Sequence, residues 1–180
     1  MTSPSTEAPL IIRPSTDADV SAILAIYAHA VLNGTGTFET EVPSVDEMAR
    51  RRQEVLGRQL PWLVAERNGD VLGYAYGNYF RPRLAYRYCI EDSIYLAPSA
   101  QGQGIGRLLL AELIARCEAA GARQMLAVIG DAQNAGSVGL HTALGFQHTG
   151  VLKSSGWKFG RWLDVVLMQR SLGPGDQSEP

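Results

Sequence analysis

A glycine-rich turn in the second half of the chain constrains the fold most. The residues Gln101-Gly-Gln-Gly-Ile-Gly106 follow an apolar segment that ends near Leu96 and precede a helical pattern that begins near Ile105. Glycine permits a tight turn, so that consecutive main-chain N–H groups point into one concavity at the start of a helix. Those groups and the helix dipole favour a phosphate or pyrophosphate, and Arg107 is placed to add a charge-assisted contact. The turn therefore predicts a strand–turn–helix unit that binds an anionic ligand.

Several interpretations of this turn compete. A P-loop needs a lysine after its last glycine, and none follows Gly106. A dinucleotide-binding turn has the spacing Gly-x-Gly-x-x-Gly and normally follows the first strand of its domain, whereas here the glycines alternate and several strands precede them. What remains is a turn that binds an acyl-coenzyme A, or a glycine-rich connection without a ligand. The turn alone does not decide between these two.

Hydrophobic periodicity and turn residues predict the order strand, two helices, three strands, helix, strand, helix, two strands. Ser44 and Glu47 have the spacing of a helix capping box, and Asn68-Gly69 is typical of a hairpin. The segment 125–129 is apolar throughout, as in a strand buried on both faces, and a long loop is expected before the last strand. This order is that of a mixed α/β sheet with helices packed against it. The expected strands are 10–13, 62–66, 71–79, 88–96, 125–129, 146–151 and 162–168, and the expected helices begin near Asp17, Ser44, Ile105 and Asn134.

Length, charge and hydropathy limit the classes of protein. The chain has 180 residues, and we expect one domain over residues 10–170 with flexible tails at 1–9 and 173–180. The formal net charge is −2 and basic residues are spread along the chain, which argues against nucleic-acid binding. No apolar segment approaches the ~20 residues that cross a bilayer, and the first residues lack the pattern of a secretory signal. These features predict a soluble cytoplasmic protein with no membrane partner.

The cysteines and histidines give no sign of a disulfide or a metal site. Cys89 and Cys117 lie in apolar surroundings without Cys-x-x-Cys spacing, so reduced, buried thiols are expected. The three histidines, at positions 29, 141 and 148, are scattered and have no neighbours at metal-ligand spacing. No Gly-x-Ser-x-Gly sequence supports a Ser-His-Asp mechanism. We therefore predict neither a metal nor serine-hydrolase chemistry.

The pattern Gln101-x-x-Gly-x-Gly106, with the strand before it and the strand and short helix after it, resembles the GCN5-related N-acetyltransferase superfamily over residues 11–168. The resemblance implies a mixed, mostly antiparallel sheet of about seven strands flanked by about four helices, with acetyl-coenzyme A as the acyl donor. It also implies that the turn's amides hold the pyrophosphate, that the preceding strand pairs with the pantetheine arm, and that Asn134 contacts the cofactor. The implied cofactor-binding residues are Ile94, Tyr95, Leu96, Gln101, Gly102, Gln103, Gly104, Ile105, Gly106, Arg107 and Asn134.

Within that superfamily the chain is similar to the phosphinothricin acetyltransferase group, which acetylates the α-amine of small amino-acid analogues. The residues that carry this similarity are 37–40, 73–75, 90–95, 140–146 and 156–164. Trp157 departs from the group, where a small or polar residue is more typical, and this leaves the choice of substrate open. The resemblance implies a homodimer and a small-molecule amine substrate of the phosphinothricin, methionine sulfoximine or methionine sulfone type. A protein or peptide N-acetyltransferase and a non-catalytic acyl-coenzyme A sensor stay open as alternatives.

Amine acetylation needs a base for the ammonium proton, and Glu91 is the best candidate. It lies in an apolar strand just before the expected pantetheine-binding segment, where burial would raise its pKa towards the working pH. Strand alternation places Glu91 on one face with Ser93 and Tyr95, and Asp92 on the other. Asp92 is the alternative base if the register is shifted by one residue. A surface carboxylate on an edge strand is the alternative interpretation of Glu91.

Two further steps of the reaction need donors. The main-chain N–H of Ile94 or Tyr95 is expected to stabilise the oxyanion, since this strand is expected to separate from its neighbour near the cofactor. His141 occupies the position at which many acetyltransferases carry a tyrosine. His141 is therefore either the group that protonates the leaving thiolate or a structural histidine.

The substrate-binding residues are expected on two sides of Glu91. The resemblance places Arg81 at a substrate-loop position, where a guanidinium suits the carboxylate of an amino acid, and Arg83 is a second candidate or a solvated loop charge. Phe38 and Glu39 are expected to close the pocket from the opposite side, with a loop anchor as the alternative for Phe38. Lys158 and Trp162 are implied either in the site or in a dimer contact. The expected substrate-binding residues are Phe38, Glu39, Arg81, Pro82, Arg83, Glu91, Asp92 and Ser93.

Overall fold

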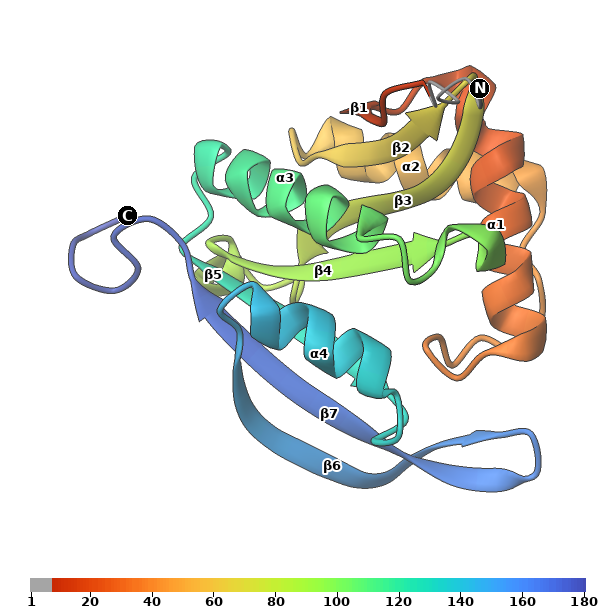
Figure 1. Ribbon diagram of the computed structural model, residues 1–180. Helices are drawn as coiled ribbons and strands as arrows, with labels where there is room; N and C mark the ends of the chain where they lie inside the picture. Colours follow the sequence, from red (N-terminus) through yellow and green to blue (C-terminus); the bar gives the residue numbers. More distant parts are fainter. Residues whose placement is uncertain (1–7) are drawn as a thin grey trace, which may run out of the picture.

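The computed structural model describes residues 8–180, and the expected N-terminal tail lies, up to residue 7, outside them. Its centre is a seven-stranded sheet in the order β1-β2-β3-β4-β5-β7-β6 (Figure 1). Neighbouring strands are antiparallel except β4 and β5, which are parallel. The predicted fold class and order of elements are therefore confirmed. The strands are β1 (Ile11–Pro14), β2 (Trp62–Arg67), β3 (Asp70–Tyr79), β4 (Cys89–Leu96), β5 (Gln124–Gly130), β6 (Gln147–Lys158) and β7 (Arg161–Ser171), and the α-helices are α1 (Val20–Asn33), α2 (Val45–Gly57), α3 (Ile105–Ala119) and α4 (Ala135–Ala143).

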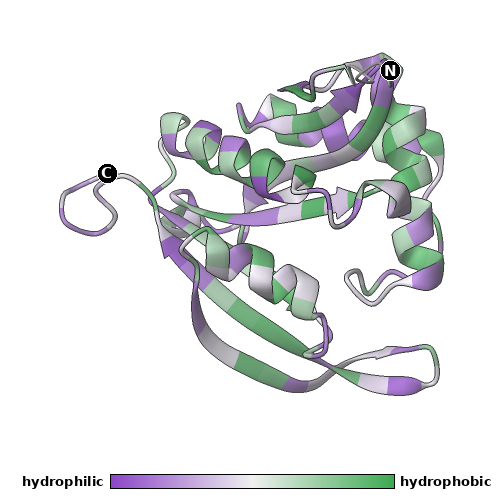
Figure 2. Ribbon diagram, viewed as in Figure 1, coloured by the Kyte–Doolittle hydropathy of each residue, from purple (hydrophilic) through white to green (hydrophobic). Residues whose placement is uncertain are grey.

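The helices form two layers, with α1 and α2 on one face of the sheet and α3 and α4 on the other (Figure 1). Tyr27 of α1 packs edge-on against Tyr95 of β4, with ring centroids 5.1 Å apart. On the other face of the same strand, Asp92 contacts His141 of α4. Apolar side chains fill the space between the layers, and Figure 2 shows hydrophobic residues along much of α1 and β7. Burial of this apolar surface is the main stabilising contribution to the fold.

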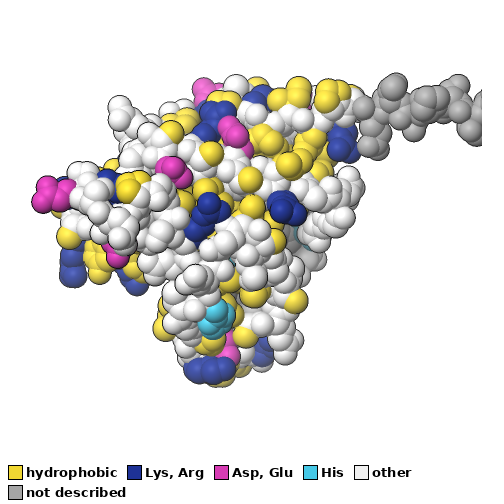
Figure 3. Space-filling model, turned by 60° about the vertical axis from the view of Figure 1, so that its left-hand side comes forward, with side chains coloured by type: hydrophobic (Ala, Val, Ile, Leu, Met, Phe, Trp, Pro, Cys, Tyr) yellow, Lys and Arg dark blue, Asp and Glu magenta, His cyan; other side chains and the backbone are white. Residues whose placement is uncertain are grey.

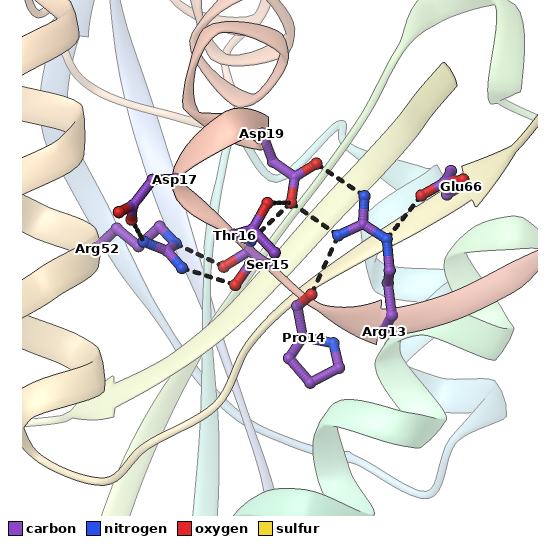
Figure 4. A network of polar contacts seen from close by, with 8 residues as sticks. All are labelled: Arg13, Pro14, Ser15, Thr16, Asp17, Asp19, Arg52 and Glu66. Carbon is purple, nitrogen blue, oxygen red and sulfur yellow. Dashed lines mark hydrogen bonds and ion pairs between the residues drawn. The ribbon is translucent and has the colours of Figure 1, made fainter. Parts of the chain in front are cut away.

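An ion-pair network fixes the chain between β1 and α1 (Figure 4). Arg13 binds both carboxylate oxygens of Asp19, at 2.7 and 2.8 Å, and its Nε donates to Glu66 at 2.6 Å. Asp19 also accepts a hydrogen bond from the main-chain N–H of Thr16 at 2.7 Å. A bidentate guanidinium–carboxylate pair has a defined geometry, so the network orients the start of α1 against β2.

Asp17 does not cap the helix, contrary to the sequence-based prediction. It is the first residue of a short 3-10 helix, η1 (Asp17–Asp19), and the capping contacts are made by Thr16 and Asp19. The carboxylate of Asp17 instead accepts a hydrogen bond from the buried Arg52 of α2 at 2.6 Å. The prediction failed because the helical turn begins one residue earlier than expected, with Thr16 as its N-cap and Asp19 completing the capping box.

Two hairpins differ in how well the sequence predicted them. The turn between β2 and β3 has left-handed Asn68 and Gly69, with φ values of 56° and 85°, as the predicted hairpin requires. The expected long loop between the last two strands is wrong, because β6 and β7 form one long hairpin closed by Phe159 and Gly160, at φ values of 52° and 72°. A register shift between residues 152 and 156 bends it, and the stretch rich in glycine and serine there resembled a loop in sequence.

The parallel strands β4 and β5 separate along their length. Their last paired residues are Asp92 and Ala127, and beyond this point β4 pairs only with β3 and β5 only with β7 among the described strands. Val128 of β5 is 36% exposed, so the strand is not buried on both faces as predicted. The separation leaves the main-chain groups on one edge of residues 93–96 without a strand partner.

The C-terminal residues 173–180, expected as a flexible tail, form turns against β5. Arg123 donates to the carbonyl oxygens of Gly175 at 3.3 Å and Glu179 at 2.8 Å. The two cysteines are free, and Cys117 is buried while Cys89 is half-buried. Within residues 8–180, no helix has both the length and the apolar character to cross a membrane. Figure 3 shows a face of the molecule on which basic and acidic side chains lie interspersed among hydrophobic ones.

Candidate active site

A cavity of about 970 Å³ occupies the opening between β4 and β5. Its walls come from the end of α1 and the loop after it, from both separated strands, from the glycine-rich turn and from α4. This volume is at the upper end of the range of small-molecule sites. Residues of the expected cofactor and substrate sets that line it are Phe38, Glu91, Asp92, Ser93, Ile94, Tyr95, Leu96, Gln101, Gly102, Gly104, Gly106, Arg107, Asn134 and His141.

The glycine-rich turn forms one end of this cavity. Gly102 and Gly104 adopt left-handed conformations, with φ values of 74° and 77°, and a side chain on either would extend into open space. Since α3 begins at Ile105, its first N–H groups precede the helical hydrogen-bond pattern, and Gly104, Gly106 and Arg107 line this end of the cavity. These groups and the helix dipole suit an anion such as a pyrophosphate, as the sequence predicted.

Two members of the expected cofactor set do not line the cavity. The side chain of Ile105 is buried in the core, and Gln103 turns away to donate to the carbonyl oxygen of Ser99 at 2.6 Å. Gly106 is closely packed, because a Cβ there would lie 3.3 Å from Leu96. The turn therefore contributes main-chain groups and the residues Gln101 and Arg107 to the cavity wall, but not every residue of the expected cofactor set.

Asn134 holds the opposite wall at the start of α4. Its side-chain oxygen accepts a hydrogen bond from the N–H of Ser137 at 3.2 Å, so it is the N-cap of the helix. Its amide nitrogen lies 3.7 Å from the place where a Cβ of Gly36 would be. Asn134 therefore fixes α4 with one end of its amide and has its other end beside the loop that lines the cavity.

Glu91 lies on the face of β4 that the sequence predicted. Tyr95, four residues further on and therefore on the same face of the strand, contacts α1, which places Glu91 on the α1 side of the sheet. Burial raises the pKa of Glu91, the neighbouring Asp92 raises it further, and the positive charge of Arg81 opposes the shift. A carboxylate with a raised pKa at a cavity wall is suited to proton transfer near neutral pH.

Asp92 and His141 form a buried pair on the other face. His141 Nε2 lies 3.0 Å from Asp92 Oδ2, and His141 Nδ1 lies 2.7 Å from the carbonyl oxygen of Ser137. A carbonyl only accepts, so Nδ1 carries a hydrogen and the contact with Asp92 holds one further proton. Burial by itself would lower the pKa of His141, but the hydrogen bond and charge of Asp92 raise it. Both ring nitrogens are therefore engaged, and Asp92 points away from the face that carries Glu91.

The arginine loop lies outside the cavity. Arg81, Pro82 and Arg83 are exposed and are absent from its lining, and the Arg81 guanidinium lies over the ring of Phe80, 4.8 Å from its centroid. The structure therefore does not bring the expected carboxylate clamp into the cavity, although the charge of Arg81 acts on Glu91.

Phe38 and Glu39 were both expected at the pocket, but only Phe38 lies in the cavity wall. The ring of Phe38 lines the cavity, as predicted. Glu39 forms an ion pair with Arg51 of α2 at 2.6 Å and is absent from the lining. Arg51, which the sequence did not indicate, therefore binds the carboxylate that was expected at the pocket.

Sequence reasoning missed Tyr76 and the last turn of α1, which also line the cavity. Tyr76 of β3 lies directly opposite Ser93 in the β3–β4 register, so aligning the two strands would have indicated it. His29, Ala30 and Asn33 recur on one face of α1, and polar residues on a mostly apolar helix were the available signal. Among residues 8–180, no three His, Cys, Asp or Glu side chains are grouped as a metal site.

Comparison with known proteins identifies the family. The model of the acetyltransferase (GNAT) family matches residues 25–146. A phosphinothricin N-acetyltransferase of Alcaligenes faecalis is 56% identical over 94% of this chain and 86% of its own length. An L-methionine sulfoximine/L-methionine sulfone acetyltransferase of Salmonella typhimurium is 40% identical over 91% of this chain and 95% of its own length.

A solved structure gives the same result. The GNAT superfamily phosphinothricin acetyltransferase of Sinorhizobium meliloti, in complex with acetyl-coenzyme A, is 49% identical and matches with a TM-score of 0.92. The match covers 95% of this chain and 92% of that structure. The chain belongs to the GNAT family of acetyltransferases.

Proposed function

We propose that this enzyme transfers the acetyl group of acetyl-coenzyme A to the α-amine of a small amino acid or analogue, of the phosphinothricin, methionine sulfoximine or methionine sulfone type. One observation carries the proposal: a single cavity has an anion-binding turn at one end and a carboxylate with a raised pKa, Glu91, in its wall. The names of the relatives that are 56% and 40% identical support the substrate class.

The residues present fit acetyl-coenzyme A. The open left-handed glycines and the free N–H groups at the start of α3 would hold the pyrophosphate, with Arg107 beside them. The unpaired edge of β4 at residues 94–96 would bind the amides of the pantetheine arm by main-chain hydrogen bonds. Asn134 would contact the arm from the α4 side. When bound, the cofactor supplies the activated acetyl group.

Glu91 acts as the general base in this proposal. It accepts a proton from the ammonium group of the substrate, directly or through a water molecule, because its raised pKa lies closer to the working pH. The main-chain N–H of Ile94 or Tyr95, on the free edge of β4, stabilises the negative charge that develops on the acetyl oxygen. Phe38, Tyr76 and Ser93 line the cavity around the same face and position the acceptor.

His141 fits a positioning role better than the role of proton donor. Its two ring nitrogens are bonded to Ser137 and Asp92, so giving a proton to a thiolate would break one of these contacts. The pair instead joins α4 to β4 at the point where β4 and β5 separate. We assign His141 and Asp92 to the support of the cavity floor.

We also infer that the molecule is a homodimer, joined through the tip of the β6–β7 hairpin. Trp157, Phe159 and Trp162 are each more than half exposed there, an unusual amount of aromatic surface for a monomer. Sedimentation equilibrium should give twice the 19.5 kDa of one chain, and Trp162→Glu should shift the mass towards that of one chain. A single-chain mass for the wild type at micromolar concentration would exclude this assembly.

Thiol release from acetyl-coenzyme A tests the proposed function. The acceptor panel contains phosphinothricin, methionine sulfone, methionine sulfoximine, common amino acids, polyamines and a peptide. Release with a small amino acid or analogue is expected. Two results would contradict the proposal. One is thiol release with the peptide alone; the other is the absence of release with every acceptor of the panel although coenzyme A still raises the melting temperature.

A further inference from the structure

Lys158, the last residue of β6, is a buried cation that binds main-chain carbonyls of a distant loop. The residue is 3% exposed, and its Nζ donates to the carbonyl oxygens of Gly34 at 2.8 Å and Thr37 at 2.9 Å. Gly34 is the C-cap of α1, so the ammonium group lies at the negative end of the helix dipole. A buried ammonium needs such bonds to compensate for lost hydration, and these two bonds connect the loop to the hairpin.

The loop at residues 34–38 fits into a space that two glycines create. A Cβ on Gly156 of β6 would lie 2.2 Å from a ring carbon of Phe38. A Cβ on Gly130, the last residue of β5, would lie 2.3 Å from the carbonyl oxygen of Thr35 and 2.9 Å from the Phe38 ring. Any other residue at either position would displace the loop. The absence of side chains here therefore sets where Phe38 lies.

A third contact fixes the loop from the side of α1. The hydroxyl groups of Tyr27 and Thr37 form a buried hydrogen bond of 2.9 Å. The loop is thus held by α1, by the end of β5 and by the hairpin. Of the residues in these contacts, Gly34, Thr37, Phe38 and Gly130 line the cavity while Lys158 does not. Lys158 therefore influences the cavity only through the loop.

We propose that Lys158 is a positioning residue for the acceptor: it holds the loop at residues 34–38 so that Phe38 forms one wall of the acceptor side of the cavity. This assignment rests on the proposed function, which places the amine beside Glu91. It also connects the hairpin, whose tip carries exposed aromatic side chains, to the acceptor side of the site.

Hydrogen exchange of the enzyme without acceptor tests the clamp itself. Lys158→Met keeps a chain of similar length but removes both donors. Amides at residues 34–40 should exchange about tenfold faster or more in this variant, the factor for loss of one hydrogen bond to a charged group. Exchange in β2 and α3 should be unchanged. Lys153→Met is the matched control, since Lys153 lies on the same strand but forms an exposed ion pair with Asp164.

Steady-state kinetics test the acceptor role. Lys158→Met should raise the KM for the amine about tenfold and the KM for acetyl-coenzyme A by clearly less, because the contacts that hold the loop involve no residue of the glycine-rich turn. Lys158→Arg should recover part of the loss. Gly156→Ala, which keeps the lysine but displaces Phe38, should raise the amine KM as well. If Lys158→Met does not fold, Lys158→Arg and Gly156→Ala carry the same comparison.

The outcomes separate this inference from the proposed function. Unchanged exchange at residues 34–40 in a folded Lys158→Met would overturn the clamp. Faster exchange with an unchanged amine KM would overturn the acceptor role. A wild-type enzyme that acetylates no amine would overturn the proposed function and the acceptor role with it, whereas the clamp is judged by the exchange experiment alone.

Discussion

The adjacent carboxylates Glu91 and Asp92 show how the direction of a side chain assigns its chemistry. Because successive residues of a strand point to opposite faces, Glu91 faces the α1 side of the cavity while Asp92 faces α4. The sequence predicted this division. It did not predict that Asp92 would meet His141, because the two residues are 49 positions apart and only the packing of α4 on β4 brings them together.

Replacement of Asp92 should destabilise the enzyme. Asp92→Ala leaves the buried His141 without its partner, so we expect a loss of about 3–5 kcal/mol in the free energy of unfolding, as for other broken buried pairs. Asp92→Asn should lose less unfolding free energy, because the asparagine amide can donate a hydrogen bond to the neutral Nε2 of His141. Urea unfolding measures both, with the exposed Asp70→Asn as control.

The same pair predicts a pH dependence. Asp92 raises the pKa of His141 above its ordinary value of 6.5, so the protonated histidine is favoured in the folded state. The extra stability of the wild type over Asp92→Asn should be fully present below pH 6.5 and should be lost as the pH rises through the raised pKa. A stability difference that does not vary with pH would show that His141 stays neutral.

At the scale of elements, local signals predicted most of the structure. The asparagine–glycine turn between β2 and β3 and the glycine turn before α3 were found because each needs left-handed residues that glycine and asparagine supply. The β6–β7 hairpin was missed because its bend carries glycine and serine, and because pairing between strands outweighs local propensity. The separation of β4 from β5 was expected near the cofactor, but its position after Asp92 has no local signal, since it depends on the neighbours of both strands.

The glycine turn gives a prediction at this scale. Gly104→Ala puts a left-handed alanine at φ 77°, which should cost about 1–2 kcal/mol and redirect the N–H groups at the start of α3. The KM for acetyl-coenzyme A should therefore rise more than the KM for the amine. Gly139→Ala is the control, because it lies exposed within α4 with no atom within 4 Å, and its stability should be equal or higher. Equal changes in both KM values would contradict an anion-binding turn.

At the scale of the whole molecule, the cavity exists because segments far apart in sequence meet at the opening of the sheet. The resemblance predicted which strand and turn take part, and the structure places most of those residues in one lining. The position of Arg81 outside it was not predictable, because a loop between strands has no periodicity to orient its side chains. Lys158 was foreseen only as a residue of the site or of a dimer contact, since its partner Gly34 lies 124 positions away.

The central claim is that this cavity joins a cofactor turn to a general base. The pH dependence of kcat for Glu91→Gln, beside the wild type and the control Glu112→Gln, which alters a half-exposed carboxylate of α3, tests it most directly. In the wild type, activity should rise with pH through the raised pKa of Glu91, because only the carboxylate accepts a proton. In Glu91→Gln this rise with pH should be absent, and kcat should be roughly 10²- to 10⁴-fold lower than in the wild type, with coenzyme A binding unchanged. A variant with a near-normal rate and the same pH profile would contradict the account.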